Sequence, residues 1–154
     1  MTAVTHAAYV RRETLISMAI NGTLSLLFFL IVFGRTNPVP VWGPGMWVFD
    51  FLPQSFMIAL MGTLVPGAIT ARRLKTGVLQ PSAATSRRPR ALVLRALLLA
   101  MLSAVLGTGL VALLSLAIGL VTLDWTMALV LKVAYGLALA GIVTPVGLWR
   151  ALVP

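Results

Sequence analysis

The chain has 154 residues, of which 60% are hydrophobic and only 10% charged, and its formal net charge is +9. Soluble domains are nearer half apolar and about a quarter charged, so this composition leaves too little polar surface to cover a soluble fold. Cysteine is absent and His6 is the single histidine, which excludes disulfides, thiolate metal sites and bis-histidine haem within one chain.

Four apolar stretches are long enough to cross a bilayer. About 20 helical residues span a hydrocarbon core of about 30 Å, and the stretches of about that length or longer lie at 15–34, 53–71, 94–119 and 125–148. We therefore expect a single domain, residues 1–154, that forms an all-α integral membrane protein. Its predicted architecture is an antiparallel bundle of four transmembrane helices.

Basic residues gather at one level of this bundle. Six of them lie between the second and third stretches and Arg95 lies at the start of the third, whereas the two opposite loops carry only Arg35. The positive-inside rule then places both termini and the basic loop at 74–93 in the cytoplasm, and we expect a bacterial inner membrane. No recognised motif supports nucleic-acid binding. The cations expected to contact anionic lipid headgroups are Arg72, Arg73, Arg87, Arg88 and Arg90.

Two of the three acidic residues lie at the opposite level, each beside a predicted helix start. Asp50 precedes the second helix and Asp124 precedes the fourth. A carboxylate at such a position accepts hydrogen bonds from free N–H groups and is favoured by the helix dipole. We interpret both residues first as helix caps.

Lys132 lies inside the fourth apolar stretch, about two helical turns from its start. A charge at this depth costs on the order of 2.5–3.5 kcal/mol, so it is a candidate functional residue. The structural alternative is a snorkelling side chain, or one paired with Asp124 on the same face or with Asp50 across helices. Tyr135 lies one turn deeper, where its hydroxyl and the lysine amine together would suit an anionic or carbonyl group.

The first apolar stretch carries polar residues three or four apart, which places them on one helix face: Thr14, Ser17, Asn21 and Ser25. Such a stripe is expected to face other helices, with interhelical hydrogen bonds as its simplest role. The alternative is a polar path shared with Thr63, Gln54 and Lys132.

Small residues mark the predicted helix contacts. On the third helix they are Ala104, Gly107, Thr108 and Ala112, which predicts a central packing helix or a dimer face. Gly62 and Pro66 on the second helix match Gly141 and Pro145 on the fourth. This match suggests two tandem hairpins related in parallel, with both prolines kinking equivalent helices.

These residues favour a non-enzymatic function. The acids are spread out and no histidine lies in a predicted span, so we expect neither catalysis nor a metal or other cofactor. The favoured hypothesis is an interaction protein, either an accessory or assembly subunit of a membrane complex or a homo-oligomer. One alternative is an oligomeric transporter or channel for small solutes or ions, which uses Lys132 and the polar stripe. Another is a binder of lipid, quinone or pigment.

Overall fold

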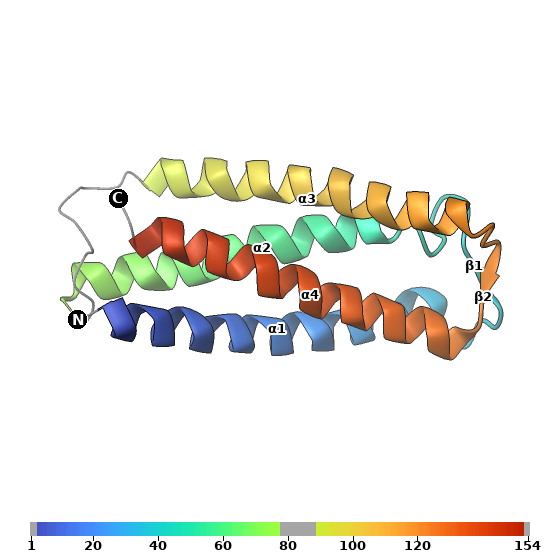
Figure 1. Cartoon of the computed structure of the whole chain (residues 1–154), viewed down its shortest axis with the longest axis horizontal. Helices are drawn as coiled ribbons and strands as arrows, with labels where there is room; N and C mark the ends of the chain where they lie inside the picture. The colour runs from blue at the N-terminus through green and yellow to red at the C-terminus, as the bar shows by residue number, and fades with distance from the viewer. Residues whose placement is uncertain (1–2, 78–88, 153–154) are drawn as a thin grey trace.

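The computed structural model describes residues 3–77 and 89–152, and its helices form a bundle (Figure 1). In chain order the elements are α1 (Ala3–Phe33), β1 (Val39–Pro40), α2 (Phe51–Lys75), α3 (Pro89–Ala117), β2 (Thr122–Leu123) and α4 (Trp125–Leu152). Each helix contains a segment long and apolar enough to cross a membrane. The predicted bundle of four such helices is confirmed.

Two helices occupy the middle of the bundle. α2 and α4 pack on each other, α1 packs mainly on α4, and α3 packs mainly on α2 (Figure 1). α1 begins, α2 ends, α3 begins and α4 ends at one end of the bundle, which we call the terminal end. β1 and β2 lie at the opposite end, which we call the ribbon end. The pairing of α1 with α4 and of α3 with α2 is what two parallel-related hairpins would produce, and the repeat stays a prediction.

The expectation that the third helix is central is wrong. α3 lies at the edge of the bundle and packs mainly on α2, and its small residues Ala100 and Gly107 contact side chains of both α2 and α4. Ala100 is fully buried in a cluster with Ala59 and Val143, while Leu98 and Leu113 on the same helix are 62% and 67% exposed. Small residues indicate where a backbone approaches a neighbour closely, and they do so at the edge of a bundle as well as at its centre.

Glycines end two of the helices. Gly34 follows α1 with a φ of 53°, and its N–H donates to the carbonyl of Leu30 at 3.0 Å. Gly119 follows α3 with a φ of 63°, and Leu120 N–H donates back to the Ser115 carbonyl at 2.8 Å. A left-handed residue at this position lets the chain turn while the last helical carbonyls stay satisfied. After each of these turns the chain continues into a loop at the ribbon end.

The two loops at the ribbon end are joined to each other. β1 and β2 pair antiparallel, with Val39 opposite Leu123 and Pro40 opposite Thr122. Three indole N–H groups donate across the same junction: Trp42 to the Leu120 carbonyl at 2.7 Å, Trp47 to that of Ala128 at 3.1 Å, and Trp125 to that of Gly34 at 2.7 Å. We call this set of contacts the ribbon cap.

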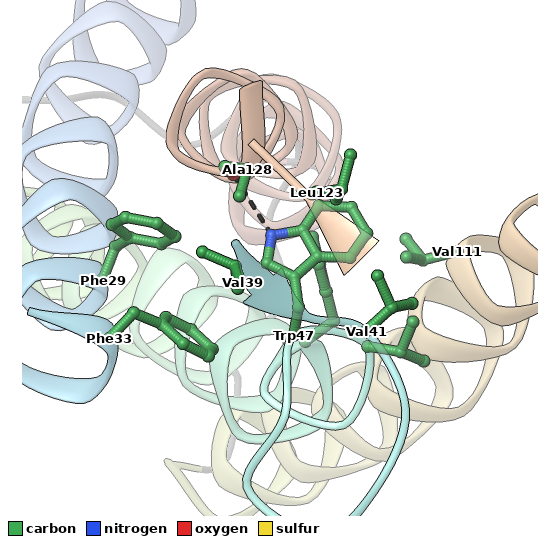
Figure 2. Close-up of a cluster of buried hydrophobic side chains, with 10 residues drawn as sticks. Phe29, Phe33, Val39, Val41, Trp47, Val111, Leu123 and Ala128 are labelled. Carbon is green, nitrogen blue, oxygen red and sulfur yellow. Dashed lines mark hydrogen bonds between the residues drawn. The ribbon is translucent and has the colours of Figure 1, made fainter. Parts of the chain in front are cut away.

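An apolar cluster fills the space beneath the ribbon cap (Figure 2). Phe29 and Phe33 enter from α1, Val111 from α3 and Ala128 from α4, around the indole of Trp47. Val39 and Val41 are fully buried there. The cap is therefore part of the core and fixes all four helices at this end.

Gly107 on α3 provides the first testable packing contact. A Cβ at this position would overlap the hydroxyl of Tyr135, whereas a Cβ at Gly109 would meet no atom within 4 Å. We expect Gly107→Ala to lower the free energy of unfolding by about 1–3 kcal/mol through overpacking. Gly109→Ala is the matched control and should be neutral or stabilise by up to about 1 kcal/mol. Thermal unfolding in detergent measures both variants, and equal effects would contradict this packing.

Candidate functional site

A buried ion pair lies at the ribbon end. The Lys132 ammonium of α4 pairs with the Asp50 carboxylate, which lies just before α2. The Lys132 side chain is fully buried and that of Asp50 is 18% exposed. The ammonium also lies 4.6 Å from the centre of the Phe51 ring and 5.8 Å from that of Phe33. Lys132 is thus a paired interior lysine that does not snorkel to the surface.

The two acids near the ribbon end have different roles. Asp124 caps α4, where its Oδ1 accepts hydrogen bonds from the N–H groups of Thr126 at 2.9 Å and Met127 at 3.3 Å. Asp50 occupies the N-cap position of α2 but makes no side-chain capping bond. The cap interpretation is correct for Asp124 and wrong for Asp50, because the Asp50 carboxylate forms the ion pair with Lys132.

A neutral polar layer lies next to the ion pair. Gln54 Nε2 donates to Ser25 Oγ at 2.8 Å and to the Lys132 carbonyl at 3.3 Å. The Tyr135 hydroxyl is hydrogen-bonded to Ser55 Oγ at 2.6 Å. Lys132 and Tyr135 therefore have separate partners, both from the α2 side, and do not share one open site.

The polar stripe of α1 faces the other helices. Ser17, Asn21 and Ser25 are buried, with exposed fractions of 8%, 7% and 2%. Asn21 Nδ2 donates to the Ser17 carbonyl at 2.8 Å, and Thr144 Oγ1 donates to Ser17 Oγ at 2.8 Å. Thr14, at the edge of the stripe, donates to the Val10 carbonyl at 2.8 Å. Ser25, through Gln54, joins the stripe to the layer beside the ion pair.

Glycines accommodate these polar groups at the helix contacts. A Cβ at Gly62 would lie 3.2 Å from Thr144 Oγ1, and one at Gly136 would overlap Ser25 Oγ. A Cβ at Gly141 would lie 3.3 Å from the Met18 sulfur, so this glycine faces α1. In the matched pair, Gly62 therefore faces both α4 and α1, where a Cβ would also lie 3.8 Å from Ser17 Oγ, whereas Gly141 faces α1.

Both central helices contain a proline within a continuous helix. Pro66 lies inside α2 and Pro145 inside α4. Each proline lacks the N–H that would donate to the carbonyl four residues earlier, at Gly62 and Gly141 respectively. Thr63, next to Gly62, is 3% exposed and its hydroxyl has no partner among the described residues. The middle of the bundle thus combines small residues with two carbonyl groups that receive no N–H from the prolines and with the buried hydroxyl of Thr63.

The terminal end has its own polar contacts between α1 and α2. Arg73 pairs with Glu13 at 3.2 Å and stacks over the Tyr9 ring at 5.2 Å. The Tyr9 hydroxyl is hydrogen-bonded to Thr70 Oγ1 at 3.0 Å. Of the other predicted lipid contacts, Arg72 is exposed. Arg87, Arg88 and the side chain of Arg90 lie outside the described residues.

Sequence reasoning missed several partners in this site. Ser55 and Thr144 bind the predicted site residues Tyr135 and Ser17, and Phe33 and Phe51 flank Lys132. Hydroxyl residues inside apolar spans were the available signal for the first two. Ala112 borders the ribbon cluster, and Thr108 on α3 has a buried hydroxyl without a partner in the described chain.

Comparison with protein-family models, with curated proteins and with solved structures finds no match for this chain. Within residues 3–77 and 89–152, no three His, Cys, Asp or Glu residues gather to hold a metal ion. The functional assignment therefore depends on the residues described above.

Lys132 is fully buried and Asp50 is partly exposed, so we expect substitutions at these two residues to lower the stability of the protein by different amounts. Asp50→Asn should cost about 3–5 kcal/mol, because it leaves the buried Lys132 charge without a partner. Lys132→Met should cost less, since Asp50 is partly exposed and can be hydrated. The double variant should be more stable than Asp50→Asn alone. Arg73→Gln is the control and should cost about 0–1 kcal/mol, because its pair with Glu13 is partly exposed.

Unfolding in detergent at neutral pH, followed by circular dichroism, measures this cycle. If the double variant is less stable than both single variants, the ion pair does not determine the energetics of this site.

Proposed function

We propose that this protein is a small non-enzymatic subunit of a membrane complex, which binds other membrane helices through its apolar outer surface. The observation that carries the proposal is that the polar site residues lie inside the bundle, whereas its outer surface is apolar. The predicted site residues Lys132, Tyr135, Gln54 and Asn21 all bind partners inside the bundle. The outer surface is apolar, so recognition there would depend on shape.

The edge position of α3 supports this role. α3 contacts mainly α2 and presents a long face of large apolar side chains, among them Leu98, Val105 and Leu113 at 62%, 63% and 67% exposed. In a bilayer this face meets either acyl chains or another helix. Association between membrane helices comes from close packing, which such a surface permits.

The distribution of exposed basic residues supports one orientation of the bundle in the membrane. Arg11, Arg12, Arg72 and Lys75 are exposed at the terminal end, whereas Arg35 is the exposed cation near the ribbon cap. The positive-inside rule then favours a cytoplasmic terminal end in a bacterial inner membrane. Each cation near an anionic membrane surface contributes about 1 kcal/mol of attraction, so anionic lipids are expected partners at this end.

Native mass spectrometry after gentle extraction from the protein's own membranes tests the proposal. We expect the protein to retain a second polypeptide in a defined stoichiometry. Broadening the α3 face with Leu98→Trp should weaken that complex, while Thr36→Ser, at an exposed site outside the helices, should leave it intact. A monomer without any retained polypeptide would contradict a subunit role.

A second candidate function is an oligomeric transporter or channel for a small solute or ion. The observation that favours it is the run of buried polar residues Ser17, Asn21 and Ser25, which lies between the Arg73–Glu13 and Lys132–Asp50 ion pairs. Residues four apart follow one helix face. This run therefore supplies polar groups along much of the bundle interior.

Purified protein in lipid vesicles tests the second candidate through fluxes of H⁺, K⁺ and Cl⁻. We expect Asn21→Leu to abolish any flux, because it replaces the central amide of the stripe with an apolar side chain. Thr23→Leu is the matched control, since Thr23 is exposed and its hydroxyl binds only the Ala19 carbonyl. No flux in the wild type, or equal flux in Asn21→Leu, would remove this candidate.

A further inference from the structure

The Lys132–Asp50 pair is asymmetric in its access to water. Lys132 is fully buried, whereas the Asp50 side chain is 18% exposed at the ribbon end. Protons from the solution on that side can therefore reach the carboxylate, while the ammonium remains enclosed by the bundle. Protonation of Asp50 would remove the negative charge and leave the positive charge inside.

Few other groups can compensate Lys132. The cluster beneath the ribbon cap is apolar and includes Phe33 from α1, Val111 from α3 and Phe51 from α2. On α4, Asp124 caps its own helix and Tyr135 is bound to Ser55. A cation over an aromatic ring gains about 0.5–2 kcal/mol, which is less than a buried unpaired charge costs.

The ribbon cap is tied to the helical turn that carries Lys132. The indole N–H of Trp47 donates to the carbonyl of Ala128, which lies one turn before Lys132 on α4. The Asp50 backbone N–H in turn donates to the Met46 carbonyl, next to Trp47. Movement of Lys132 toward water would therefore disturb the cap, and with it the contact between β1 and β2.

We propose that the Asp50–Lys132 pair is an acid-sensitive latch, which holds the ribbon cap closed and opens it when Asp50 is protonated from the ribbon side. Opening exposes the layer of Gln54, Ser25, Ser55 and Tyr135 to water at that end. The latch does not depend on either proposed function, and it supplies conditional access to the polar interior.

The absence of cysteine from the chain gives a direct measurement, because a single introduced thiol is the only one. Val41→Cys places a reporter at a fully buried position of the cap, and Thr36→Cys places a control at an exposed position of the same loop. The labelling rate of the buried thiol, divided by that of the exposed thiol, reports opening and corrects for the reagent's own pH dependence.

At neutral pH, Asp50→Asn mimics the protonated carboxyl and should raise the labelling ratio about tenfold or more, since a broken buried pair is strongly destabilising. Adding Lys132→Met to this variant should return the ratio to near the wild-type value, because no buried charge then remains. In the wild-type pair, acidification should raise the ratio reversibly, because a protonated Asp50 leaves the buried ammonium without its counter-charge.

The latch is overturned if Asp50→Asn labels like the wild type, or if the double variant labels as fast as Asp50→Asn. It is also overturned if acid raises the ratio equally in the double variant, which has neither charge. Should Asp50→Asn fail to fold, the acid response of the wild-type pair against that of the double variant still decides the question.

Discussion

A lysine ammonium inside a bundle of apolar helices requires a counter-charge, and the ribbon end of this protein is arranged around that requirement. The Asp50 side chain makes no capping hydrogen bond, although its position before α2 would allow one, and pairs with Lys132 instead. The indole of Trp47 and the pairing of β1 with β2 hold the Asp50 loop against α4. The electrostatic demand of Lys132 thus accounts for the position of the Asp50 carboxylate, while the apolar neighbours of Asp50 in the loop are buried in the hydrophobic cluster.

Elsewhere in the interior, several polar side chains meet a glycine on a facing helix. Tyr135 lies against Gly107, Ser25 against Gly136 and Thr144 against Gly62. A glycine lets the helices approach closely enough for hydroxyl groups to find partners, so polar contacts and close packing occur at the same places. The outside has neither feature, and its large apolar side chains carry little information about a ligand.

Much of the fold could be predicted because span length and charge asymmetry reflect simple physical limits. The inward direction of Ser17, Asn21 and Ser25 also followed from their spacing. The ribbon could not be predicted, because two-residue strands show no periodicity and their partners are far apart in the sequence. The edge position of α3 was missed because small residues record a close approach and do not tell how many neighbours make it. The choice between Asp50 and Asp124 for Lys132 depended on the fold of the loops.

The order of the two charges along the chain has a consequence for biosynthesis. Asp50 precedes α2 and Lys132 lies in α4, so the carboxylate is synthesised before the lysine with which it pairs. If α4 crosses a bilayer, an unpaired lysine two turns into the helix disfavours insertion by on the order of 2.5–3.5 kcal/mol. A fragment that begins after Lys75 lacks Asp50, so its Lys132 would meet this cost without the counter-charge that it has in the whole chain.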